Sequence, residues 1–392
     1  MSQSLKIGLV LPAEPGYSET FIWSKVEGLL KSGNSVSLFV NRLNKNGEIN
    51  NLVPVYSIPD FTIKYFLLFV LFKIIIQNPF RIIKFIYLER LSKINWAIII
   101  KHLIINSHIL SKKLDWLQFE FATMGIGREN VAQAMGSKSA VSFRGFDIGL
   151  YPHKHPECYN LLWQTIDKVH TISDDLYNNA IKLGLNPKTP FEKITPAIDV
   201  NLFTYRAKTI LHNPIRILSV GRLTWKKGFE YSLKSMELLK MNGIRFEYRL
   251  VGDGEYREAI EYAIHQLKLK DEVLLLGELS HEKVKNEMEW ADIYLQPSIQ
   301  EGFCNAVLEA QAMGLLSIVT NADGLSENVL DGETGWVVPK RSPKAITEQL
   351  IKIINMNMSK YNKIREKTVK RVNNEFCSTN QINKWVAFYK YD

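Results

Sequence analysis

The residues with the clearest chemical potential are two cations, Arg222 and Lys227, in the segment GRLTWKKG that follows the apolar run Ile215–Val220. The run predicts a strand and the glycines predict a loop, so both side chains can reach one anion. Arginine offers a planar fork of donors and lysine a compact charge, which together suit a diphosphate. A solvated basic loop is the alternative interpretation of the same residues.

Two carboxylates, Glu301 and Glu309, lie eight residues apart around the start of the predicted helix Asn305–Met313. Gly302 allows an anionic group to approach the helix start, where free N–H groups and the dipole favour a phosphate. Because a carboxylate repels a diphosphate, we expect these two to accept hydrogen bonds from neutral hydroxyls. One would take a vicinal diol such as ribose and the other a sugar ring. A capped amphipathic helix with two solvent-facing acids is the alternative.

Two series of alternating strands and helices must position these residues, with a boundary near residues 200–213. Each series predicts a parallel sheet, which binds ligands outside the carboxyl ends of its strands, and a cleft between two such domains is the expected site. The first series has strands Lys6–Pro12, Ser35–Val40, Trp116–Phe121, Ala140–Phe143 and Lys168–Ile172, with helices Glu19–Lys31 and Asp175–Leu183. The second has strands Ile215–Val220, Phe246–Val251, Val273–Leu276, Ile293–Gln296 and Ser317–Thr320, with helices Phe229–Met241, Glu255–Leu267 and Asn305–Met313. An aromatic helix, Thr379–Tyr391, is expected at the end.

Composition places the chain among globular proteins of two domains, with 392 residues, 46% apolar and 23% charged. Three widely spaced cysteines build no disulfide framework, which favours a reducing compartment. The N-terminus reads as a first strand rather than a signal peptide, so we expect a cytoplasmic protein.

The positive charge is concentrated in one segment. Nine Lys and Arg residues lie between Phe61 and Lys113, opposed only by Glu89, whereas the whole chain carries +9. The longest apolar stretch there, Tyr65–Phe72, is well short of the roughly 20 residues that span a bilayer. The composition predicts helices lying on an anionic membrane surface, at the inner face of the cell membrane. In the alternative interpretation, part of this segment forms the core of the domain. The apolar content of the segment argues against a nucleic-acid-binding arm.

The second half of the chain resembles the retaining family 4 glycosyltransferases, which carry an E-x7-E motif. The resemblance covers residues 215–338 through SVGRLTWKKG, LVGDGEYRE, LLGELSHEKV, ADIYLQPSIQEGFCNAVLEAQAMG and NADGLSENVLDGETGWVV. The N-terminal half matches more loosely, through Ser18–Phe21, Phe143–Ile148 and Val169–Leu176.

The resemblance implies an α/β protein of GT-B fold, with two facing Rossmann-like domains and a deep interdomain cleft. Residues 1–205 would form the acceptor domain and residues 206–375 the nucleotide-sugar domain. Residues 376–392 would form a helix that crosses back to the first domain.

The resemblance also assigns roles to individual residues. Arg222 and Lys227 would bind the diphosphate, Glu309 the ribose, and Glu301 the hydroxyls of the transferred sugar. Further donor contacts are implied for a set of mainly backbone groups: Gly302, Phe303, Cys304 and Asn305 at the phosphates and sugar, Gly277 to Leu279 at the base, Gly252 at the cleft, and Gly16 in the first loop.

Arg144 departs from the family pattern, because many relatives have a histidine there, near the transferring sugar. Arginine is no base at neutral pH, but it can stabilise a departing phosphate. Arg144 is therefore either a third phosphate-side cation, which we favour, or part of an interdomain salt bridge.

The implied activity is transfer of a hexose, with retained configuration, from a nucleotide-diphosphate sugar to a lipid-linked glycan in surface polysaccharide synthesis. Since two or three fixed cations spread the leaving-group charge and the chain has no D-x-D, no metal or other cofactor is expected. The alternatives are a soluble acceptor, a nucleotide-sugar epimerase or sugar-phosphate synthase, and a non-enzymatic sugar-nucleotide-binding scaffold.

Overall fold

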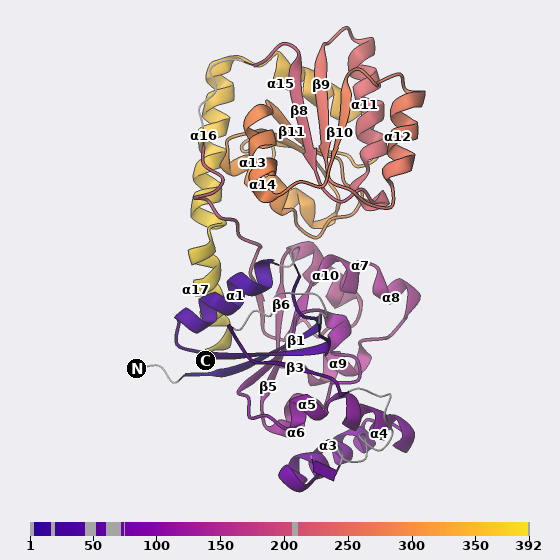
Figure 1. The fold of residues 1–392 in the computed structure, drawn as a ribbon, viewed down its shortest axis with the longest axis vertical. Coiled ribbons are helices and arrows are strands. Elements are labelled where there is room, and N and C mark those ends of the chain that lie inside the picture. The colour runs from indigo at the N-terminus through magenta and orange to yellow at the C-terminus, as the bar shows by residue number, and fades with distance from the viewer. Residues whose placement is uncertain are drawn as a thin grey trace. The chain divides into compact units, whose positions relative to one another are not determined.

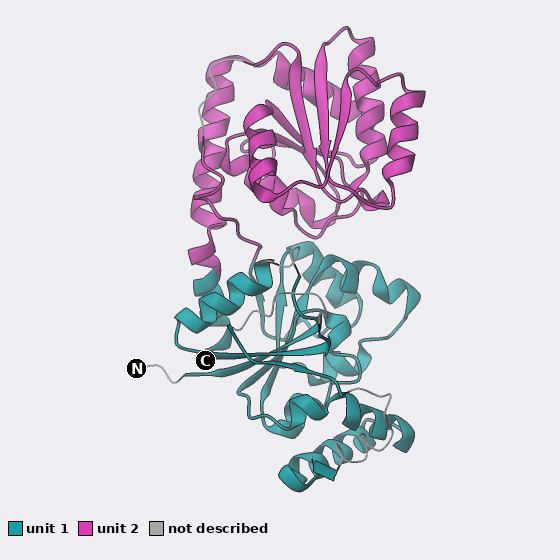
Figure 2. Ribbon diagram, in the orientation of Figure 1, with its two compact units in different colours: residues 1–194, 382–392 teal, residues 195–381 magenta. Residues whose placement is uncertain are grey.

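The computed structural model describes residues 4–16, 20–43, 52–59, 72–73, 75–205 and 211–390. The chain divides into two compact units (Figure 2). Unit 1 contains residues 1–194 and 382–392, and unit 2 contains residues 195–381. Of the segment Ser18–Phe21 that resembles the family, the first two residues lie outside the described residues.

Unit 1 is built on a parallel sheet whose strand order is β3-β2-β1-β4-β5-β6-β7. The order reverses between β1 and β4. In β1, Leu9 lies opposite Leu38 of β2 on one side and Gln118 of β4 on the other. The strands are β1 Lys6–Ala13, β2 Ser35–Arg42, β3 Val55–Ser57, β4 Trp116–Phe119, β5 Lys138–Phe143, β6 Lys168–Thr171 and β7 Phe191–Lys193.

The helices of unit 1 alternate with these strands (Figure 1). They are α1 Thr20–Lys31, α3 Pro79–Leu91, α4 Trp96–Ile105, α5 Ser107–Leu110, the 3₁₀ turn η2 Ala122–Met124, α6 Val131–Met135, α7 Gly145–Gly149, α8 Tyr151–Lys154, α9 Asn160–Thr165 and α10 Asp174–Lys182. Helix α3 starts after Asn78, and Pro79 occupies its first turn, where no amide partner is needed. Helix α10 is capped by Ser173, whose side chain accepts from the Leu176 amide.

The C-terminal helix α17, Ser378–Tyr389, completes the core of unit 1 although it comes last in sequence (Figure 1). Its Trp385, Phe388 and Tyr389 are buried in the same apolar cluster as strands β1 and β2. The indole N–H of Trp116 donates to the Tyr389 carbonyl at 3.0 Å. The aromatic content of the last predicted helix is thus explained by packing against the sheet.

Unit 2 repeats the same architecture, with strand order β10-β9-β8-β11-β12-β13. Its strands are β8 Ile215–Val220, β9 Phe246–Val251, β10 Val273–Gly277, β11 Ile293–Gln296, β12 Leu316–Thr320 and β13 Trp336–Val338. Its helices are η3 Trp225–Lys227, α11 Phe229–Met241, α12 Arg257–Gln266, α13 His281–Trp290, α14 Asn305–Ala312, η4 Asp323–Asn328, α15 Pro343–Ile354 and α16 Met358–Glu375. Helix α11 packs against α12 and α15, and α14 packs against α16.

Candidate active site

The candidate site lies at the carboxyl ends of β8 and β11, where the strand order of unit 2 reverses. Such a reversal leaves a crevice in which open α/β sheets bind their ligands. The loop of residues 221–228 follows β8, and the loop of residues 297–304 follows β11. These two loops carry the predicted cations and the first predicted carboxylate.

Backbone contacts hold the two loops together. The Ile299 amide donates to the Lys226 carbonyl at 2.7 Å. Gly228 has φ 63° and starts α11, and a Cβ atom there would lie 2.3 Å from the Pro297 carbonyl oxygen. Only glycine fits this approach, so the second glycine of GRLTWKKG sets the distance between the loops.

Lys227 and Glu301 form an ion pair across the two loops. The Lys227 Nζ atom lies 2.5 Å from Glu301 Oε2, and the side chains are 18% and 19% exposed. Burial lowers the pKa of Lys227, but the charge of Glu301 more than offsets this, so the pKa is raised and the amine stays charged. Glycine at 221 makes room for the lysine, because a Cβ atom there would lie 3.1 Å from Lys227 Cε.

Arg222 and Lys226 add positive charge beside this pair. Burial lowers the pKa of Lys226, and the charges of Arg222 and Lys227 lower it further. The three cations belong to one loop, and the charges of Glu301 and Glu255 oppose the lowering of the Lys226 pKa. Within the described residues, the Arg222 guanidinium has no hydrogen-bond or ion-pair partner, and its side chain is exposed. It is thus available to an anionic ligand.

The N-terminus of α14 is open to a ligand. Its N-cap, Cys304, makes no capping hydrogen bond through its side chain, and the first turn has no acidic residue. The Cys304 backbone is held instead by Asn328, whose amide group accepts from the Cys304 N–H at 3.1 Å and donates to the Cys304 carbonyl at 2.9 Å. Unsatisfied helix amides and the dipole make such an end attractive to phosphate.

The Cys304 thiol itself is a packing group. It is buried, and burial raises its pKa to about 11 despite the opposing charge of Lys227. Phe303 beside it is also buried and packs on Phe376, with ring centroids 5.8 Å apart. Both residues therefore offer a ligand their backbone rather than their side chains, whereas Asn305 is exposed and Gly302 is half-buried.

Glu309 lies in the second turn of α14. Burial raises the pKa of its carboxyl group to about 7. No described residue donates a hydrogen bond to this carboxyl group or forms an ion pair with it. A mostly buried carboxylate without a partner is unfavourable, and hydroxyl groups of a ligand would relieve that cost.

Glycines in neighbouring turns allow the loops at this end of the sheet to approach each other closely. Gly252 has φ 134°, and a Cβ atom there would lie 2.1 Å from the Gly221 carbonyl oxygen. The Gly252 amide donates to the Gly277 carbonyl at 2.7 Å. The GDG segment is therefore a tight turn between β9 and α12. Gly277 ends β10, and the half-buried Leu279 follows just before α13.

Two of the predicted site residues belong to unit 1, at the carboxyl edge of its sheet. Arg144 follows β5, and its Nη2 lies 3.2 Å from Glu120 Oε2, so its ion-pair partner is in its own unit. Gly16 follows β1, is exposed, and a Cβ atom there would meet open space.

Asn328 is the functional candidate that the sequence did not single out. It is fully buried, and its backbone carbonyl accepts from Arg371 at 2.8 Å. It lies in the segment NADGLSENV, which resembles the family, but it ends the short 3₁₀ helix η4, which gave no periodic signal. Only the fold brings it to the start of α14.

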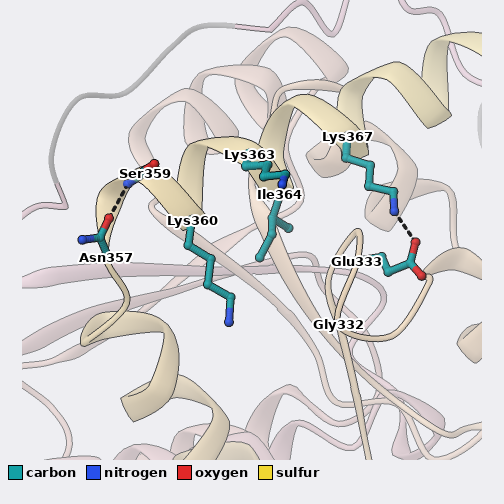
Figure 3. Close-up of a pocket in the computed structure, with 8 residues that line it drawn as sticks. All are labelled: Gly332, Glu333, Asn357, Ser359, Lys360, Lys363, Ile364 and Lys367. Carbon is teal, nitrogen blue, oxygen red and sulfur yellow. Dashed lines mark hydrogen bonds and ion pairs between the residues drawn. The ribbon is translucent and has the colours of Figure 1, made fainter.

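Other features of unit 2 contribute less to this site. A separate depression of about 720 Å³ lies beside the start of α16, where Lys360 and Lys363 line it and Lys367 pairs with Glu333 (Figure 3). None of these residues belongs to the candidate site. In the parts of the chain that the structure describes, no cluster of three or more His, Cys, Asp or Glu side chains could hold a metal ion.

Comparison with known sequences identifies relatives of this domain. Residues 203–371 match the family Glycosyl transferases group 1. Over 262 residues the chain is 30% identical to the putative colanic acid biosynthesis glycosyltransferase WcaL of Escherichia coli (strain K12), covering 64% of this chain and 63% of that protein. Over 232 residues it is 30% identical to the amylovoran biosynthesis glycosyltransferase AmsK of Erwinia amylovora, covering 56% of each. The chain thus spans less than two thirds of the length of these curated relatives.

Comparison with solved structures identifies the fold. The chain is similar to the Anabaena protein HepE in complex with UDP, with a TM-score of 0.72 and 14% identity over 98% of both chains. Together with the two parallel sheets of seven and six strands, this similarity confirms the predicted α/β GT-B fold.

Proposed function

We propose that this chain, whose residues 203–371 match the family Glycosyl transferases group 1, is a retaining hexosyltransferase of cell-surface polysaccharide biosynthesis. Its donor would be a nucleotide-diphosphate sugar and its acceptor a hydroxyl of a lipid-linked glycan. The observation that carries the proposal is the meeting of Arg222, Lys227 and Glu301 at the switch point of unit 2, beside the open helix that bears Glu309. The similarity to WcaL, a putative glycosyltransferase of colanic acid biosynthesis, and to AmsK, a glycosyltransferase of amylovoran biosynthesis, supports the polysaccharide context.

Each donor group has a complementary feature in the site. The diphosphate would lie between the cations of the β8 loop and the amides that start α14. Glu309 would accept hydrogen bonds from the ribose hydroxyls, and Glu301 from hydroxyls of the sugar. The turn at Gly277 and Leu279 would contact the base. The complex of HepE with UDP supports a nucleotide in a protein of this fold.

The reaction breaks the bond between the anomeric carbon of the sugar and the diphosphate oxygen. The electron pair of that bond leaves with the diphosphate, whose oxygen accepts the proton of the acceptor hydroxyl on the same face. The acceptor oxygen then bonds to the anomeric carbon, so the configuration is retained. Arg222, Lys227 and the start of α14 stabilise the charge that grows on the leaving group. We propose that these groups suffice without a metal ion or a further cofactor.

The acceptor side of the proposal rests on an exposed apolar face of α3. Phe80, Ile83, Tyr87 and Leu91 recur along one side of this helix and are 61–85% exposed. The opposite side, with Phe85 among its residues, is buried in unit 1. An apolar stripe of this size that the described residues leave exposed indicates a partner.

The charge around this face favours an anionic membrane as that partner. Trp96 and Ile100 of α4 are also exposed, and so are Lys84, Arg90 and Lys101. The only carboxylate between residues 75 and 113 is Glu89, which is buried and hydrogen-bonded to His102 and Asn130. Exposed apolar groups amid unopposed cations suit a helix lying in a bilayer interface. Among the described helices, none is long and apolar enough to cross a bilayer.

The structure also shows which cations of this segment serve the fold. Arg81 donates to the carbonyls of Leu110 and Lys112, so it stabilises the turn after α5 rather than facing solvent. Lys64 lies outside the described residues. We propose that Lys73, Lys84 and Lys101, all exposed, contact lipid headgroups. This would place a cytoplasmic enzyme on the inner face of the cell membrane.

A thermal-shift panel of UDP, GDP, ADP and CMP, followed by the matching sugar nucleotides, tests the proposed donor class. We expect one diphosphate to raise the unfolding midpoint, and the corresponding sugar nucleotide to be consumed. No shift with any of the four would overturn the proposal. Epimerisation of the sugar nucleotide without release of the diphosphate would favour the epimerase alternative.

A further inference from the structure

A buried carboxylate at the carboxyl edge of the unit 1 sheet is shared by two cations. Glu120 directly follows β4 and is fully buried. Its Oε1 lies 2.5 Å from Lys25 Nζ of α1, and its Oε2 lies 3.2 Å from Arg144 Nη2. Lys25 is 2% exposed and Arg144 is 15% exposed, so both contacts are largely shielded from water.

The arginine is held at both of its ends. Its backbone N–H donates to Asp147 Oδ1 at 2.8 Å, and Asp147 Oδ2 accepts from the Ala122 amide at 2.8 Å. Its guanidinium lies over the Phe21 ring, 4.1 Å from the centroid. Glu120 therefore adds the contact that sets the direction of the guanidinium above that ring.

The lysine is held from the opposite side by the C-terminal helix. Lys25 Nζ lies 3.5 Å from the centroid of the Trp385 ring and 5.6 Å from that of Tyr389. A contact between an ammonium group and aromatic faces is favourable, particularly away from water. The contacts therefore run from the aromatic rings of α17 to Lys25, from Lys25 to Glu120, and from Glu120 to Arg144.

The charges along these contacts belong to two cations and one carboxylate. A single Arg144–Glu120 pair would be neutral and would attract an anion weakly. With Lys25 added, two positive charges share the carboxylate of Glu120, while burial raises the pKa of the neighbouring Asp147 carboxyl group to about 7. Removal of the carboxylate would leave two buried cations facing each other, which is strongly unfavourable.

We propose that Glu120 is a positioning residue that orients Arg144 for the sugar-transfer step, and that Lys25, held by Trp385 of α17, fixes Glu120. This inference rests on the proposed function and on the interpretation favoured from the sequence, in which Arg144 is a third cation that stabilises the departing phosphate. Glu120 would act through Arg144 alone and would contact neither donor nor acceptor.

A double-mutant cycle tests the coupling. We expect Glu120→Gln to lower kcat about tenfold or more while the donor KM changes less than twofold. In an Arg144→Gln background the same substitution should leave kcat unchanged within twofold, because the residue through which it acts is gone. Losses that multiply in the double variant would overturn the inference.

A second cycle covers the case in which Glu120→Gln does not fold. Trp385→Phe keeps an aromatic ring on α17 and weakens the contact with Lys25, so it should lower kcat only while Arg144 is present. Phe388→Leu is the matched control, since Phe388 is buried on the same helix but faces Lys168, 4.7 Å away. Equal effects of the two substitutions on kcat would contradict the inference. A wild-type protein that releases no diphosphate from any donor would instead refute the proposed function.

Discussion

The Lys227 ammonium lies 2.5 Å from the Glu301 carboxylate, so a cation proposed for the diphosphate and an acid proposed for the sugar are ion-paired. The pair joins the loop after β8 to the loop after β11, at the point where the sheet order reverses. A donor whose phosphate and sugar hydroxyls meet at this point would find both partners already in place. Such preorganisation lowers the cost of ordering the site when the donor binds.

The cations of the β8 loop should affect turnover more than donor binding. We expect Arg222→Gln and Lys227→Gln each to lower kcat by about 100-fold, because one charge-assisted contact that strengthens in the transition state contributes roughly 3 kcal/mol. The donor KM should rise by a smaller factor. Lys234→Gln on α11, where the lysine pairs with Glu237, is the control and should leave both constants unchanged. Near wild-type turnover in both variants would refute the proposed role.

Glu309 should make nucleotide affinity depend on pH. Burial raises the pKa of its carboxyl group to about 7, so the group is mainly neutral at pH 6 and mainly ionised at pH 8. Ribose hydroxyls donate to the ionised form more strongly, and the affinity should therefore rise about tenfold between these pH values. In Glu309→Gln the affinity should be weaker by roughly 1.5–3 kcal/mol at pH 8. The part of the pH dependence that is due to Glu309 should also disappear.

Calorimetric titration of the nucleoside diphosphate at both pH values measures this effect. The comparison between wild type and Glu309→Gln cancels the titration of the phosphate itself. A folded variant with wild-type affinity and the same pH dependence would show that the ribose binds elsewhere.

Turnover should continue in EDTA. The cations of the β8 loop and the start of α14 would carry the charge that a divalent ion carries in other transferases. The measurement is diphosphate release by metal-stripped protein, with and without added magnesium or manganese. Complete loss of activity that only a divalent ion restores would contradict the proposed function of Arg222 and Lys227.

The α3 face should bind anionic vesicles. Each near-surface lysine adds about 1 kcal/mol, so changing Lys73, Lys84 and Lys101 together to glutamine should weaken binding roughly 100-fold. Three exposed lysines of unit 2, changed in the same way, provide the control: Lys270, Lys344 and Lys352. Flotation with liposomes that contain phosphatidylglycerol, at low and high salt, is the measurement. Equal binding to neutral vesicles, or none to either kind, would favour a soluble acceptor.

Much of the fold could be predicted from the sequence because its central strands are continuous apolar runs. Ile215–Val220, Phe246–Val251 and Ile293–Gln296 were predicted with the bounds that the structure shows. The edge strands β3, β7 and β13 were not predicted, since three residues are too few to show a pattern. Helix α17 was predicted from its aromatic residues, but its place in the core of unit 1 depends on contacts across more than 270 positions of the chain, as between Trp116 and Tyr389.

Part of the candidate site could also be predicted from the sequence, because its residues follow the central strands. Arg222, Lys227 and Glu301 follow central strands, so topology alone brings them to one edge. The ion pair between Lys227 and Glu301, the Asn328 contact with Cys304 and the Glu120 contact with Arg144 join loops that are far apart in sequence. No local pattern encodes such contacts, because they depend on how the loops fold over the ends of the strands.

The most direct test of the account is ¹H NMR of a sugar nucleotide during its slow hydrolysis by the purified enzyme in EDTA, without acceptor. Water then takes the place of the acceptor hydroxyl. For a donor with an α-linked sugar, the account predicts that the nucleoside diphosphate and the free α-anomer appear together, before mutarotation produces the β-anomer. A first product in the β configuration would contradict the retaining mechanism. Absence of any diphosphate release, from every donor whose nucleotide binds, would contradict the proposed glycosyl transfer itself.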